Sequence, residues 1–112
     1  MKNRGQLIEI FISNLANSIV HQILEKAANE PAHIERYDKE MKNSRQLAKN
    51  YRDKINPVNK PLPFRDIEEV KQKLINKVNI ELNLRISKGY QNINLDLVEE
   101  YADKALKEMN II

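Results

Sequence analysis

The stretch from Leu7 to Ala28 constrains the fold most, because its apolar residues occur as adjacent pairs repeated every four positions. This spacing predicts a long helix with one broad buried face. A four-residue repeat exceeds the helical period of about 3.6 residues, so the apolar face drifts by about 40° per step around the helix. One straight neighbour cannot cover such a face. We therefore expect several other helices, or a second copy of the chain, to share it.

The composition favours a single helical domain that is held together by packing alone. The chain has 112 residues, with two glycines and no cysteine. This length corresponds to one hydrophobic core, and we predict one domain over residues 1–112. Few glycines favour helices over hairpins. The lack of cysteine excludes disulfides, zinc–thiolate sites, iron–sulfur clusters and a cysteine nucleophile.

Polar residues and prolines mark the ends of the first two expected helices. Asn3 followed by Gln6 is typical of a capping box, so the first helix should begin near Arg4. Pro31 ends that helix and suits the first turn of the next, which we expect to continue to Ile55. The second helix carries a heptad seam, typical of a helical bundle, at Ile34, Tyr37, Met41, Ser44, Ala48, Tyr51 and Ile55.

The second half of the chain is less regular. Residues 56–66 contain three prolines and predict an extended connection. Asp66 with Glu69 resembles a capping box, so we expect the third helix to begin near Ile67 and to end near Lys88, before Gly89. A continuous helix there would turn an ion pair between Glu81 and Arg85 toward its buried stripe.

These elements predict an all-α, single-domain fold resembling a four-helix antiparallel bundle. Asp96 with Glu99 is a third capping box, although Asn94 could cap as well, and the apolar spacing of residues 95–109 indicates the last helix. The alternative is an α+β domain, because residues 78–87 alternate strictly between apolar and polar. In that case a hairpin would span about residues 78–97.

Excess apolar surface leads to our main functional prediction, a non-catalytic helical interaction or assembly module without cofactor or metal. The first helix is apolar around much of its surface, and the third would be apolar on two faces. We therefore expect a homodimer, and binding of a different protein partner is also possible. The self-association residues that we predict are Phe11, Leu15, Ile19, Ile80 and Leu84.

The alternative prediction is a nucleic-acid-binding protein. The net charge is +3, and four cations share one flank of the second expected helix. Acidic residues one or two turns earlier give a structural explanation of that flank, through acid-first pairs four residues apart. The functional interpretation is contact with phosphates. Its predicted residues are Lys42, Arg45, Lys49, Arg52, Lys60 and Arg65.

A metal-dependent enzyme is the lowest-ranked alternative. Glu30 and His33 have the Glu-x-x-His spacing that can hold a metal on a helix, and His21 and Glu25 lie nearby in the sequence. Pro31 interrupts the motif and no second copy of it occurs, so we predict no metal site.

The polar residues of the first expected helix also bear on location. Lys2 and Arg4 precede an apolar region, as in a signal peptide, but Glu9, Asn14 and Asn17 interrupt that region. We therefore expect a cytoplasmic protein without a membrane span.

Overall fold

The computed structural model describes residues 2–56 and 60–112, and these residues form four helices and no strand. The helices are α1 (Arg4–Ala27), α2 (Pro31–Ile55), α3 (Phe64–Ser87) and α4 (Leu97–Glu108). The predicted all-α, bundle-like fold is confirmed, and the alternative hairpin at 78–97 is wrong because α3 is continuous through the alternating segment. Helix α3 ends where the sequence indicated: Lys88 is its C-cap, and Gly89 follows with a positive φ of 98°.

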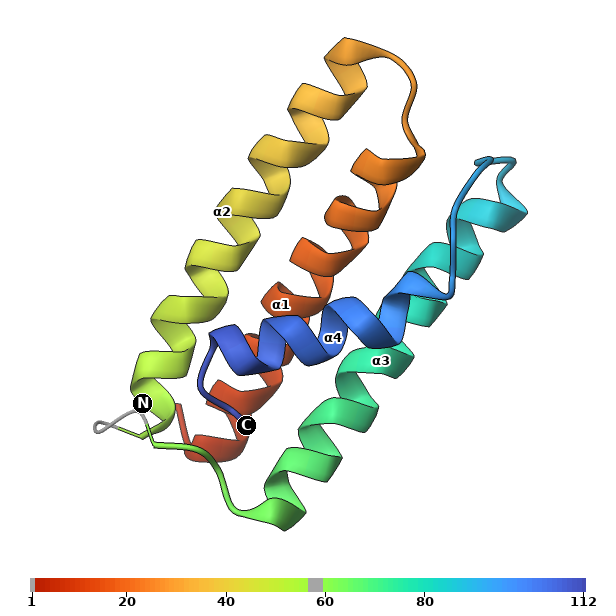
Figure 1. Cartoon of the computed structure of the whole chain (residues 1–112). Helices are drawn as coiled ribbons and strands as arrows, with labels where there is room; N and C mark the ends of the chain where they lie inside the picture. The colour runs from red at the N-terminus through yellow and green to blue at the C-terminus, as the bar shows by residue number, and fades with distance from the viewer. Residues whose placement is uncertain (1, 57–59) are drawn as a thin grey trace.

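Helix α1 lies at the centre of the arrangement. It packs against α2, α3 and α4, as its drifting apolar face predicted. Figure 1 shows α2 and α3 on opposite sides of α1, while α4 crosses α1 and α3 rather than running alongside them. The core residues of α1 are buried and include Phe11, Ile12, Leu15, Ile19 and Ile23.

The first two helices begin and end close to the predicted residues. In α1, the Gln6 backbone N–H donates to Asn3 Oδ1 at 2.8 Å, and the Asn3 N–H donates to Gln6 Oε1 at 3.0 Å. This is the predicted capping box, which satisfies two N–H groups that otherwise lack partners. Helix α2 spans the predicted residues and has Pro31 in its first turn.

The predicted start of α3 and the predicted capping bond of α4 need correction, whereas Asp96 is the N-cap of α4 as predicted. Helix α3 begins at Phe64, so Asp66 is not its N-cap; the Asp66 carboxylate instead pairs with Arg4 of α1 at 3.3 Å. Residues 64–66 therefore belong to the helix and not to the predicted 56–66 connection, of which residues 57–59 lie outside the described part. Before α4, Asn94 Oδ1 accepts the Asp96 N–H at 3.0 Å, and the Asp96 side chain makes no capping bond.

The chain after α4 is held by one buried arginine. Arg52 of α2 is 1% exposed. Its guanidinium donates to the carbonyl oxygens of Met109 (2.7 Å), Asn110 (2.8 Å) and Lys60 (2.7 Å), and to Asn56 Oδ1 (2.9 Å). Burial lowers the pKa of Arg52, with the charge of Asp53 acting in the opposite direction. Arg52 thereby joins α2, the connection before α3 and the C-terminal turn.

Backbone hydrogen bonds and apolar contacts also hold the C-terminal turn against the connection before α3. The Ile111 N–H donates to the Leu106 carbonyl at 2.9 Å, and the Leu62 N–H donates to the Ile111 carbonyl at 3.3 Å. Both Leu62 and Ile111 are buried in the core. The C-terminal turn therefore packs against the connection before α3.

Helix α1 also has the length and composition of a membrane-spanning helix. Its best 18-residue window has a mean hydropathy of 1.3, and 56% of that window is buried within the protein. The core helix of a soluble protein and a signal sequence satisfy the same criterion. The cytoplasmic location therefore stays a prediction.

Replacing Arg52 tests how much its hydrogen bonds to the C-terminal turn and to the connection before α3 contribute to stability. We expect Arg52→Met to lower the free energy of unfolding by about 3 kcal/mol, because it leaves several carbonyl oxygens without donors. Lys49→Met, at an exposed position of the same helix, should change it by less than about 0.5 kcal/mol. Urea denaturation measures both values. Equal losses in the two variants would contradict the role assigned to Arg52.

Candidate interaction surface

The predicted basic stripe of α2 does not form one free surface. Arg52 is buried against carbonyl oxygens, so its assignment to nucleic-acid binding is corrected. Arg45 is also largely enclosed: Nε donates to Ser18 Oγ at 3.0 Å, Nη2 donates to Gln22 Oε1 at 3.2 Å, and Nη1 pairs with Glu108. Lys42 pairs with Asp38 at 2.8 Å on the surface, and that hydrogen bond raises the pKa of Lys42.

Three of the predicted cations do lie together, in a cleft between α2 and the end of α4. Lys42, Arg45 and Lys49 line this cleft of about 570 Å³ together with Glu108. The carboxylate of Glu108 already occupies the position at Arg45 that an anion would take. Lys60 precedes α3 and Arg65 lies in its first turn, so neither lines this cleft. Nucleic-acid binding stays a prediction, with fewer free cations than the sequence indicated.

The contact between α1 and α2 contains a line of polar bonds, which we call the polar seam. Asn17 Nδ2 donates to Ser44 Oγ at 2.7 Å. One helical turn later, His21 Nε2 lies 2.7 Å from Glu40 Oε2. Sequence reasoning missed these partners, although the interruption of the apolar pattern of α1 by polar residues was a signal for them. The members of the seam are Asn17, Ser18, His21, Gln22, Glu40, Ser44 and Arg45.

The four residues considered for the lowest-ranked alternative, a metal-dependent enzyme, are not brought together. His21 contacts Glu40 and the backbone of its own helix, whereas His33 is exposed near Tyr37, with ring centroids 6.4 Å apart. Within residues 2–56 and 60–112, no group of three or more histidine, aspartate or glutamate side chains could hold a metal ion. Glu25 and Glu30 therefore have no metal-binding arrangement with the histidines.

One flank of α3 carries ion-paired residues near the start of the helix and exposed aliphatic residues further along. Asp66 and Lys73 bridge to α1, through Arg4 at 3.3 Å and Glu9 at 2.6 Å. Glu9 and Glu69 raise the pKa of Lys73. Ile80 follows Lys73 by seven residues, so it lies on the same flank. It is 60% exposed, and Leu84, one turn later, is 50% exposed.

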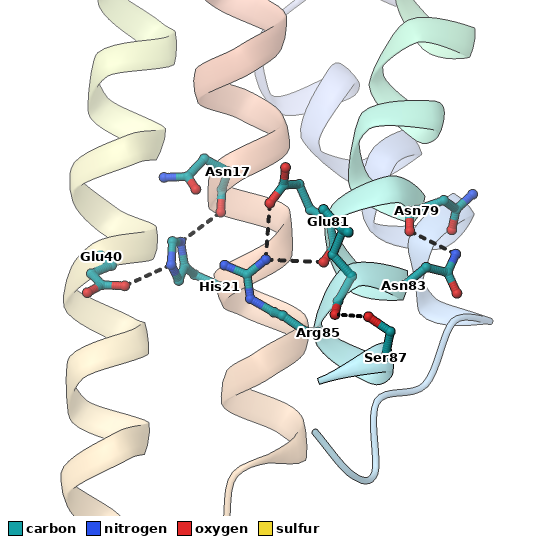
Figure 2. Close-up of polar contacts among 9 residues, drawn as sticks. Asn17, His21, Glu40, Asn79, Glu81, Asn83, Arg85 and Ser87 are labelled. Carbon is teal, nitrogen blue, oxygen red and sulfur yellow. Dashed lines mark hydrogen bonds and ion pairs between the residues drawn. The ribbon is translucent and has the colours of Figure 1, made fainter. Parts of the chain in front are cut away.

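Ile80 borders a groove between α1 and α3. This groove has a volume of about 500 Å³ and a polar α1 wall that includes Ser13, Asn14 and Asn17. On the α3 side, Lys77 and Glu81 line it beside Ile80. Figure 2 shows this face of the protein, with Asn17 and His21 on α1 and Glu81 and Arg85 on α3.

The structure corrects two further predictions about α1 and α3. Phe11, Leu15 and Ile19 are completely buried in the core of one chain, so they offer no surface for self-association. Glu81 and Arg85 do form an ion pair at 3.1 Å, but it lies at the surface and not in the core. Of the five predicted self-association residues, Ile80 and Leu84 are exposed. We call these two residues, with Lys77 and Glu81, the α3 flank.

Comparisons of the chain with protein-family models, curated proteins and solved structures gave no match.

The enclosed Arg45 is expected to be structural. We predict that Arg45→Gln lowers the free energy of unfolding by about 2 kcal/mol, because the buried Ser18 hydroxyl and the α4 end lose a charged donor. Lys42→Gln removes the same charge from the same cleft at an exposed position and should cost less than about 0.5 kcal/mol. Chemical denaturation of both variants tests this. If Arg45→Gln lowered the free energy of unfolding less than Lys42→Gln, the structural role of Arg45 would be contradicted.

Proposed function

We propose that this chain is a helical interaction module without catalytic activity, which self-associates as a two-fold homodimer through the α3 flank. The observation that supports the proposal is the exposure of Ile80 and Leu84, 60% and 50%, on adjacent turns of one helix. Burying an isoleucine or leucine side chain fully contributes about 1.5–3 kcal/mol. A symmetric contact would bury both residues from each copy.

The charges of the α3 flank suit a contact between identical surfaces. In a two-fold dimer each surface meets its own copy, so it must be complementary to itself. Lys77 and Glu81 flank Ile80 and carry opposite charges. The flank therefore has no net charge from these two residues, and like charges need not face each other across the contact. A surface with cations alone would repel its copy.

The position of the flank also favours a helix as the partner. Near the start of α3, the equivalent positions reach α1 through the pairs Arg4–Asp66 and Glu9–Lys73. Beyond Lys73 the α3 flank carries the exposed Ile80 and borders the groove with Asn14 and Asn17. The apolar residues follow one helical flank, which is the pattern by which helices pair. We propose α3 of a second copy as that helix.

Substitution of the exposed aliphatic residues tests the dimer. We expect light scattering after size exclusion to give twice the chain mass at tens of micromolar for the natural protein. Ile80→Glu and Leu84→Glu should each give the single-chain mass, because a carboxylate would be desolvated at the centre of the contact.

The matched control introduces the same charge at another exposed aliphatic residue. Leu47 of α2 is 48% exposed and lies outside the α3 flank. Leu47→Glu should leave the dimer intact. Circular dichroism should show the same helix content for all three variants. A single-chain mass of the natural protein across micromolar concentrations would overturn the proposal.

A further inference from the structure

The cleft between α2 and the end of α4 holds a carboxylate of the chain itself (Figure 1). Glu108 is the last residue of α4, and it pairs with Arg45 Nη1 although its side chain is 58% exposed. The C-terminal end of a helix carries partial negative charge, so a carboxylate is disfavoured there. Ion pairs near the surface also contribute little to stability. Glu108 is therefore held weakly enough for another anion to displace it.

Two bonds to α1 hold Arg45 in place independently of Glu108. Nε donates to Ser18 Oγ at 3.0 Å, and Nη2 donates to Gln22 Oε1 at 3.2 Å. The Arg45 side chain is 19% exposed. These bonds fix the guanidinium, so Nη1 stays directed at the cleft when the carboxylate leaves. A group fixed in this way binds an anion with little loss of side-chain entropy.

The charges that line the cleft favour a doubly charged anion. Lys42 is paired with Asp38, and Arg45 is paired with Glu108. Lys49 also lines the cleft, and it has no ion-pair partner in the described part of the chain. One carboxylate matches Arg45 alone, whereas a phosphate monoester carries a charge of about −1.5 to −2 at pH 7 and has three acceptor oxygens. Arg45 and Lys49 are four residues apart on one helix, so such a group can meet both.

The other walls of the cleft suit the organic part of a small molecule. Met41 and Met109 line it beside the side-chain amides of Gln22 and Gln46. Methionine side chains adapt to irregular shapes and make favourable contacts with aromatic rings. The volume of about 570 Å³ is within the range of small-ligand sites, about 300–1,000 Å³.

We propose that this cleft binds a small organic phosphate monoester, and that Glu108 is an internal competitor for Arg45. The phosphate group contacts Arg45 and Lys49, and the organic group lies against Met41 and Met109. Binding requires the Glu108 carboxylate to leave Arg45 and turn toward solvent. The cleft is separate from the α3 flank, so the proposal does not depend on self-association.

NMR titration with phenyl phosphate, at constant ionic strength and about pH 7, tests the site. The Arg45 Nε–H and the side-chain amides of Gln22 and Gln46 report directly on the cleft. In the natural protein we expect saturable shifts of these signals, with a Kd in the millimolar range. Benzoate has the ring but a single charge, and methyl phosphate has the phosphate group but no ring. Each of these two compounds should bind several-fold more weakly than phenyl phosphate.

Substitutions with matched controls test the competition by Glu108. Glu108→Gln should raise the affinity for phenyl phosphate by about three- to tenfold, because a neutral amide competes less for Arg45. Glu100→Gln removes an equal charge from an exposed position of the same helix and should leave the affinity within about twofold. Lys49→Gln should weaken binding several-fold. Lys54→Gln, at an exposed position of α2 outside the cleft, should not.

Three results would overturn the proposal. The first is the absence of saturable shifts of the cleft signals in the natural protein. The second is an equal effect of Glu108→Gln and Glu100→Gln on the affinity, which would indicate attraction by net charge alone. The third is binding of benzoate as tightly as phenyl phosphate, which would contradict a doubly charged ligand.

Discussion

The buried guanidinium of Arg52 is the interaction on which the arrangement of the helices depends. A charged group is costly to bury unless its donors are satisfied. Arg52 meets this requirement, because its N–H groups donate to the carbonyls of Met109 and Asn110 just beyond α4. It also donates to the Lys60 carbonyl before α3. One side chain of α2 thus holds the C-terminal turn and the connection to α3 together.

The crossing of α4 follows from the shape of the apolar surface of α1. The drift of that surface leaves residues that neither α2 nor α3 covers, and α4 lies across them with Val98, Ala102 and Leu106 buried. Lys71 of α3 pairs with Asp103 of α4 at 3.1 Å, and this contact raises the pKa of Lys71. Together these contacts orient α4 over α1 and α3. The flank of α3 on the other face, with Ile80 and Leu84, stays exposed.

Local sequence signals predicted the helices well, but they did not predict the contacts between residues far apart in the sequence. Capping by Asn3 and Gln6 and the placement of Pro31 depend on residues close in sequence, so their geometry could be inferred. The role of Arg52 could not, because three of its four acceptors are backbone carbonyls up to 58 residues away, and every residue has such a carbonyl. For the same reason, helical spacing grouped Arg52 with Lys49 although one is buried and the other exposed. Apolar periodicity likewise could not distinguish Leu15, which the chain covers itself, from Ile80, which it does not.

The face of α1 that packs on α2 and the face that borders α3 make different kinds of polar contact. Against α2, the bonds from Asn17 to Ser44 and from Arg45 to Ser18 require particular residues opposite each other, so they fix the register of the hairpin. Such polar contacts add specificity because a shifted register would leave buried groups without partners. Along the second half of α3, Ser13 and Asn14 of α1 line the groove opposite the aliphatic side chain of Ile80. Ile80 borders this polar side of α1 and stays 60% exposed.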